Sequence, residues 1–212
     1  MTGLAWLLLS IAGVAALADW WAVARTDKRV EYVTKPATLL ALISVAIVLE
    51  PSNGSMRAWF VLALAFSLAG DIFLMLPGNL FVQGLASFLV AHLAYVAGFV
   101  SGGLESGVAI VAAVVVGVAI VLYARVLIMG MTERQRSLRI PVSIYAAAIG
   151  SMLIAAIASE SPLAIIGAAL FVLSDGLIGF SRFVRPERWA PLAIIVTYHL
   201  GQTGLVLSLA FD

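Results

Sequence analysis

The amino-acid sequence predicts an all-α membrane protein whose helices cross the bilayer eight times. Of its 212 residues, 63% are hydrophobic and 11% are charged, whereas soluble domains are about half apolar and about a quarter charged. The mean hydropathy is +1.13, and the apolar runs are long enough to span a bilayer as helices rather than as barrel strands. Two further observations support this fold class: basic residues concentrate in every second predicted loop, and the chain partly repeats itself.

Proline, glycine and charged residues separate the apolar runs, as expected of turns between helices. Pro36, Pro141 and Pro162 are predicted at the starts of their helices, where the missing N–H of proline costs least. The first run continues through Trp20 and Trp21 with no Lys or Arg before it, which favours a retained helix over a cleaved signal peptide. The expected helices cover about residues 4–24, 36–50, 58–76, 80–101, 106–128, 141–158, 162–180 and 190–210.

Basic residues are concentrated on one side of the predicted bundle. Eleven of the 12 Lys and Arg residues lie in or beside the first, third, fifth and seventh loops, and Arg57 lies on the other side. Positively charged loops remain in the cytoplasm. The sequence therefore predicts a single transmembrane domain over residues 1–212 in a bacterial inner (plasma) membrane, with the N and C termini outside.

Several landmarks recur along the chain at a nearly constant spacing. They are Asp71 and Asp175, Lys35 and Ile140 (each followed by a proline), and His92 and His199, offset by 104, 105 and 107 positions. Four helices in each copy would keep both copies in the same orientation, so the pattern predicts a parallel duplication of a four-helix unit. The expected halves are about 1–104 and 105–212, and a chance match between apolar sequences is the alternative.

The candidate catalytic residues are Asp71 and Asp175, each inside an apolar helix, where an aspartate costs about 2.5–3.5 kcal/mol on insertion scales. Both lie about six residues from the basic end of their predicted helix, or about 9 Å at 1.5 Å per residue, so they share one depth. Two nearby carboxylates in a medium of low dielectric constant do not both ionise readily, which supplies an acid and a base at one pH. We therefore expect both to face one membrane-embedded active site, with structural hydrogen bonds between helices or a proton-coupled transport site as alternatives.

Further polar side chains share helix faces with the aspartates or with each other. By helical spacing, these are Ser174 beside Asp175, His92 with Tyr95, and Tyr198 with His199 and Gln202. The outer halves of the helices carry no ionisable side chain away from the interface, so the cluster is expected to open to the cytoplasm. Such a one-sided site suits an enzyme that acts on a lipid of the inner leaflet. Asp19 has no acidic counterpart in the second half, and we expect it at the interface or paired with Lys35.

Several classes of function are disfavoured by composition. The chain has no cysteine, which excludes thiol catalysis and cysteine metal sites. Its two histidines lack the HExxH spacing of zinc proteases, so a zinc site would need aspartate ligands, and no metal is expected. A net charge of +1 gives no footprint for nucleic acid.

A set of landmarks runs in order over nearly the whole chain. It comprises Lys35-Pro36, Gly70-Asp71, Leu74, Gly84, Phe88, His92, Tyr95, Tyr145, Gly167, Phe171, Ser174-Asp175, Tyr198 and Gln202. In this order and spacing the sequence resembles the YhhN family of membrane proteins, which includes the lysoplasmalogenases. One departure concerns the repeat, because Ile140-Pro141 lacks the lysine of Lys35-Pro36, so the two halves are not chemically equivalent.

The resemblance implies hydrolysis of the vinyl ether bond of lysoplasmalogens, which yields a fatty aldehyde and glycerophosphoethanolamine or glycerophosphocholine. An acid protonates the vinyl carbon, and a carboxylate stabilises the oxocarbenium-like cation and activates water, as in glycosidases. Asp71 and Asp175 would take these roles in either order, while the tyrosines (Tyr145 included), Gln202 and the histidines orient the substrate and water. Lys35 and cytoplasmic arginines would hold the phosphate, and the implied reaction requires no cofactor. The implied partners are a lysophospholipid substrate and membrane lipids, and a small-molecule or proton-coupled transporter is the alternative.

Overall fold

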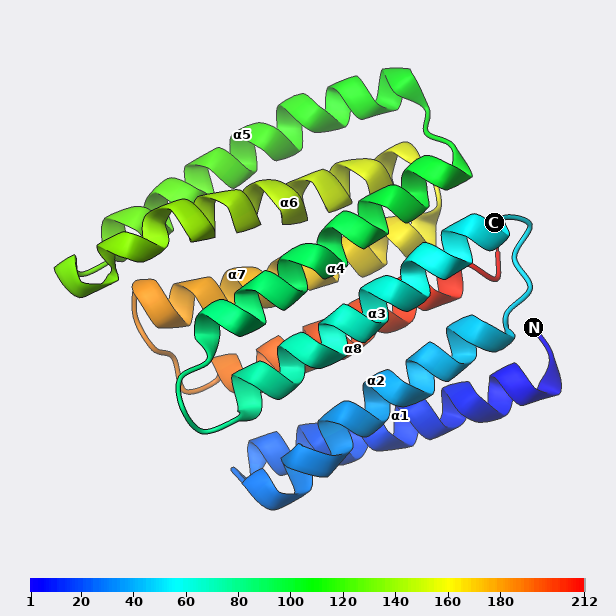
Figure 1. Ribbon diagram of the computed structural model, residues 1–212, viewed down its shortest axis with the longest axis horizontal. Helices are drawn as coiled ribbons and strands as arrows, with labels where there is room; N and C mark the ends of the chain where they lie inside the picture. Colours follow the sequence, from blue (N-terminus) through cyan, green and yellow to red (C-terminus); the bar gives the residue numbers. More distant parts are fainter. Residues whose placement is uncertain (212) are drawn as a thin grey trace.

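The computed structural model describes residues 1–211, in which the helices lie side by side along the long axis of the molecule (Figure 1). They are α1 (Gly3–Ala24), α2 (Lys28–Val48), α3 (Gly54–Met75), α4 (Phe81–Gly102), α5 (Ser106–Gly130), α6 (Arg139–Ala158), α7 (Pro162–Phe183) and α8 (Ala190–Ser208), with a 3₁₀ helix, η1 (Glu133–Leu138), before α6. In this part of the chain eight helices are long and apolar enough to cross a membrane, and no strand is present. The predicted fold class is confirmed.

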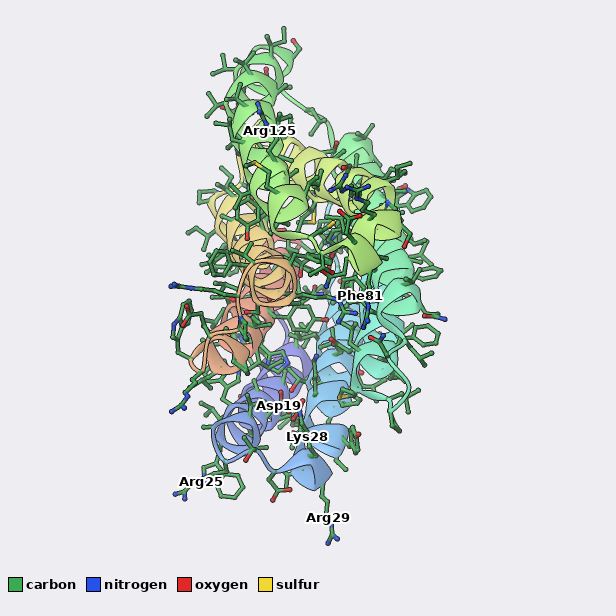
Figure 2. All side chains as sticks on the ribbon, turned by 90° about the vertical axis from the view of Figure 1, so that its left-hand side faces the viewer. Asp19, Arg25, Lys28, Arg29, Phe81 and Arg125 are labelled. Carbon is green, nitrogen blue, oxygen red and sulfur yellow. The ribbon has the colours of Figure 1, made fainter. Side chains whose placement is uncertain are left out.

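Two helix pairs flank a central group of helices (Figure 1). The pair α1–α2 lies on one flank and the pair α5–α6 on the other, while α3 packs on α4 and α7 packs on α8 between them. The α1–α2, α3–α4, α5–α6 and α7–α8 connections meet at one end of the bundle, which we call the basic end. Figure 2 looks onto it and shows Arg25, Lys28 and Arg29 at one side and Arg125 at the other.

Glycines allow the central helices to approach each other closely. A Cβ atom added to Gly70 of α3 would lie 2.6 Å from the ring of Phe88 on α4. A Cβ atom on Gly201 of α8 would lie 2.9 Å from the carbonyl oxygen of Gly167 on α7. Small residues permit this backbone contact between membrane helices, and here they bring polar side chains of the central helices within bonding distance.

The structure corrects the predicted start of α2 by two turns. Residues 28–35 are helical, so Pro36 lies inside α2 rather than in its first turn. The cause is Asp27, whose carboxylate accepts hydrogen bonds from the backbone N–H groups of Arg29 and Val30 and so caps the helix before the charged residues. This longer helix carries Lys35. The other predicted helices agree with the structure to within about one turn.

Candidate active site

Asp71 of α3 is bound by residues from two other helices. The Nζ atom of Lys35 on α2 lies 2.9 Å from Oδ1, and the hydroxyl of Tyr198 on α8 donates to Oδ2 at 2.8 Å. The Asp71 side chain is 1% exposed. A carboxylate removed from water needs such partners, because its lost hydration must be replaced. The ion pair and the hydroxyl therefore tie α2, α3 and α8 together around one buried charge.

Asp175 of α7 is bound by a different set of groups. The hydroxyl of Tyr145 on α6 donates to its Oδ2, and Nε2 of His92 on α4 lies 3.2 Å from the same oxygen. His92 Nε2 also lies 2.9 Å from the Tyr145 hydroxyl. The three side chains thus form a closed triangle of polar contacts between α4, α6 and α7.

A narrow apolar cavity adjoins Asp175. It has a volume of about 80 Å³ and extends from Phe81 and Phe183 at the basic end to Ile149 on α6. Among the described residues, Tyr123, Tyr145 and Asp175 are the polar side chains on its wall, and Asp71 does not line it. This volume lies well below the roughly 300–1,000 Å³ of drug-sized ligand pockets. The apolar lining therefore suits a short stretch of hydrocarbon beside the carboxyl group of Asp175.

Each aspartate is bound by a residue from the other half of the chain. Asp71, in the first half, accepts from Tyr198, which follows it by 127 positions. Asp175, in the second half, contacts His92, which precedes it by 83 positions. The repeat in the sequence places a histidine and a tyrosine on the helix after each aspartate. The structure brings one of each pair, His92 and Tyr198, to the aspartate of the opposite half.

The predicted site residues fall into two groups. Those that contact an aspartate are Lys35, His92, Tyr145 and Tyr198. Tyr95 instead donates to Oε1 of Gln202 at 2.5 Å, and Ser174 donates to the backbone carbonyl of Ile194 at 3.0 Å. Within residues 1–211 no cluster of three or more His, Cys, Asp or Glu side chains is placed to hold a metal ion.

A second polar cluster lies between α1, α2 and α8. Asp19 is fully buried and accepts a hydrogen bond from Thr34 at 2.7 Å. Within residues 1–211 it forms no ion pair with Lys35, so that alternative is wrong, while its place at the membrane interface stays a prediction. The reason is that Lys35, the next residue on α2, forms its ion pair with Asp71. His199 accepts from the indole N–H of Trp20 at 3.1 Å. No spacing in the sequence signals this last contact, because 179 positions separate its residues.

The fold and the site together define a multi-spanning membrane protein with ionisable groups buried between its helices. Residues 30–209 match the YhhN family, and the chain belongs to this family, which confirms the resemblance seen in the sequence. Curated relatives include "Lysoplasmalogenase TMEM86B" from Homo sapiens, 32% identical over 80% of this chain and 71% of its own length. "Lysoplasmalogenase" from Mycobacterium tuberculosis (strain CDC 1551 / Oshkosh) is 31% identical over 82% of this chain and 68% of its own. No solved structure matches the chain.

Proposed function

We propose that this protein is a lysoplasmalogenase that hydrolyses the vinyl ether bond of alkenyl-glycerophosphoethanolamine or alkenyl-glycerophosphocholine. The observation that carries the proposal is the carboxyl group of Asp175 on the wall of an apolar cavity inside the bundle, held by Tyr145 and His92. The apolar lining suits the vinyl end of the alkenyl chain, and the carboxyl group would offer a transferable proton beside it. The printed names of the relatives from human and from mycobacteria support the same reaction.

In the first step of the proposed mechanism, Asp175 protonates the vinyl carbon that is not bonded to the ether oxygen. The π electrons form the new C–H bond, and the positive charge is shared between the neighbouring carbon and the ether oxygen. Ionised Asp175 then stabilises this oxocarbenium-like cation. Asp71 supplies a second carboxylate, whose charge acts on the cation through a medium of low dielectric constant.

In the second step, water attacks the carbon that bears the positive charge, and the carboxylate of Asp175 accepts a proton from that water. The resulting hemiacetal collapses: its hydroxyl proton moves to the glycerol oxygen as the carbon–oxygen bond breaks. The products are a fatty aldehyde and a glycerophospho-base. One water is consumed, and the reaction needs neither an oxidant nor a reductant. Tyr145 and His92 keep the Asp175 carboxyl group oriented through both steps.

The basic end of the bundle is proposed to face the cytoplasm of a bacterial plasma membrane, with both termini outside. The support is the concentration of Lys and Arg at this end, since such loops are retained inside. The cavity beside Asp175 reaches the same end through Phe81 and Phe183, so substrate would come from the inner leaflet. A reporter fused to the C terminus should give a periplasmic signal, and a cytoplasmic signal would reverse the orientation.

Residues of about 1–104 and 105–212 are further proposed to be duplicated halves of one transmembrane domain. In support, α1 packs on α2 as α5 packs on α6, and α3 packs on α4 as α7 packs on α8. Tyr95 and Gln202, which are 107 positions apart, bind each other between the halves. Superposing an experimental structure of one half on the other should bring Asp71 onto Asp175; a mismatch by one helix would contradict the duplication.

The reaction is tested with purified protein in detergent, incubated with a panel of lysophospholipids that carry a vinyl ether, an alkyl ether or an acyl chain. Mass spectrometry should detect fatty aldehyde from the vinyl ether lipids, because only they carry a C=C bond beside the ether oxygen that gives an oxocarbenium-like cation when protonated. The Asp175→Asn variant serves as the inactive control. Absence of aldehyde, together with solute movement in sealed vesicles, would favour the transporter alternative.

A further inference from the structure

The cavity beside Asp175 has an aromatic rim at the basic end of the bundle. Phe81 of α4 and Phe183 of α7 pack edge to face with ring centroids 6.0 Å apart, and both line the cavity. Phe81 lies near the middle of this end in Figure 2. Arg182 holds its guanidinium over the Phe81 ring, with Cζ 3.8 Å from the centroid, and donates to Oδ1 of Asn79 at 3.0 Å. The rim therefore carries a cation that is held in place.

A second arginine lies on the cavity side of α6. Arg139 precedes Val142 and Ala146, which line the cavity, by three and seven residues, and these spacings place all three on one helix face. Its Nε atom is buried without a hydrogen-bond partner within residues 1–211. In that part of the chain neither Arg139 nor Arg182 forms an ion pair with a carboxylate. Neither arginine lines the cavity itself, and among the described residues neither guanidinium group has the anion that its planar donors favour.

The two arginines lie at similar depths relative to the polar triangle. Arg182 follows Asp175 by seven residues, which is two turns on the same face of α7, or about 10.5 Å along the axis. Arg139 precedes Tyr145 by six residues on α6, or about 9 Å. Both cations therefore lie toward the basic end from the carboxyl group, at a separation that a glycerol unit and a flexible arginine side chain together can bridge.

We propose that Arg139 and Arg182 form the phosphate-binding site for the headgroup of a single-chain glycerophospholipid. The phosphate lies at the basic rim, the ether oxygen lies beside Asp175, and the hydrocarbon chain follows the apolar wall. This inference rests on the proposed function for the reaction but assigns a separate task to separate residues. The inference assigns phosphate binding to Arg139 and Arg182 instead of Lys35. The ammonium of Lys35 is already paired with Asp71 inside the bundle, whereas the two arginines have no carboxylate partner among the described residues.

The test compares two vinyl ether substrates with the same alkenyl chain: a lysoplasmenylethanolamine, and the alkenylglycerol that lacks the phosphate. Arg182→Gln and Arg139→Gln should each raise KM for the phosphate-bearing substrate about 10- to 100-fold, the usual range for a lost hydrogen bond to a charged group. They should leave KM for the alkenylglycerol and kcat for both unchanged. Arg182→Lys keeps the charge but loses the planar fork of donors. Its KM for the phosphate-bearing substrate should therefore lie between those of wild type and Arg182→Gln.

Arg185→Gln is the matched control. Arg185 lies beyond the same end of α7 but pairs with Glu187 at 2.6 Å, so its loss should leave KM for both substrates unchanged. If Arg182→Gln and Arg139→Gln raise KM equally for both substrates, the arginines act on the fold rather than on phosphate. If KM for the lysoplasmenylethanolamine stays at the wild-type value, they do not bind the headgroup. Either result overturns the inference.

Ligand-induced shifts in Tm test the site independently of turnover. An alkyl-ether lysophospholipid, which has no vinyl group to react, should raise the Tm of wild type more than the matching alkylglycerol does. This difference should disappear in Arg182→Gln. If the protein shows these Tm shifts but does not turn over the vinyl ether substrate, the proposed reaction is wrong while the phosphate site stands. If inorganic phosphate alone gives as large a shift as the lysophospholipid, the rim binds free anions and the headgroup assignment is wrong.

Discussion

Asp71 on α3 and Asp175 on α7 would be equivalent under the proposed duplication, yet their surroundings differ. Asp71 is bound by an ammonium group and a hydroxyl, and its side chain is 1% exposed. Asp175 is bound by a hydroxyl and an imidazole, is 8% exposed and lines the cavity. The difference teaches that a similar position along the helix does not give equal access to the cavity. Access depends on which side chains fill the space between neighbouring helices, and variants at five positions test this difference.

Asp175→Asn should cause the largest loss of activity, about 10²- to 10⁴-fold in turnover, the usual contribution of general acid–base catalysis. Asparagine keeps the size of the side chain but cannot transfer the proton, and loss of a buried carboxylate should leave Tm unchanged or higher. Turnover and Tm are measured on the same samples. Asp19→Asn, at a fully buried aspartate that binds Thr34 and does not line the cavity, is the control and should retain turnover. Near-normal turnover in folded Asp175→Asn would end the two-aspartate mechanism.

Asp71→Asn should reduce turnover by about 10²-fold, the lower end of the same range, because its charge acts on the cation from outside the cavity. Combined with Asp175→Asn, it should lose little beyond the worse single variant, since residues that act as a unit are not additive. The four rate constants form a double-mutant cycle. Fully multiplicative losses would mean that the two carboxylates act independently.

Lys35→Met tests, through stability, the buried ion pair that holds Asp71 away from the cavity. Removing one partner of a buried ion pair leaves the other charge without compensation and costs about 3–5 kcal/mol, so the Tm in detergent should fall. Adding Asp71→Asn to Lys35→Met should recover most of that loss without restoring turnover. A double variant as unstable as Lys35→Met alone would show that the lysine stabilises the fold by packing rather than by charge.

Tyr145→Phe and Tyr198→Phe should give the smallest effects. Loss of the Tyr145 hydroxyl leaves Asp175 less firmly oriented and should slow turnover about tenfold, the equivalent of one hydrogen bond to a charged group. Compared with Tyr145→Phe, Tyr198→Phe should slow turnover less and lower Tm more, because Asp71 keeps its ion pair with Lys35. Tyr123→Phe is the control. It removes a hydroxyl group on the same cavity wall, and among the described residues that hydroxyl binds only the carbonyl of Gly176. This variant should change neither turnover nor Tm. Equal rate losses at Tyr145 and Tyr198 would contradict the difference between the two aspartates.

Much of the fold could be predicted from the sequence, because membrane helices are long apolar runs whose ends carry charge, proline or glycine. The exception was the start of α2. Residues 28–35 are too charged to read as part of a membrane span, and the capping carboxylate of Asp27 carries the helix through them. Apolarity identifies what enters the membrane, whereas capping decides where the helix begins.

The candidate site was only partly predictable. Lys35, His92, Tyr145 and Tyr198 were proposed as site residues, but no sequence pattern stated which aspartate each would meet. That choice depends on how each helix is rotated and on how closely glycines let it approach its neighbours, as at Gly70. The cavity wall and the positions of the guanidinium groups near it depend on the same packing, which the sequence alone does not predict.

The crossed hydrogen bonds also constrain how such a chain can be recombined. Tyr198 and Asp71 meet across 127 positions, and His92 and Asp175 meet across 83. A chimera joined in the α4–α5 connection would bring the tyrosine of one parent to the carboxylate of the other. Such a hybrid would work only if both parents share the rotation and depth of α4 and α8. Evolutionary drift in one half is therefore limited by the other half, through two contacts buried in the membrane.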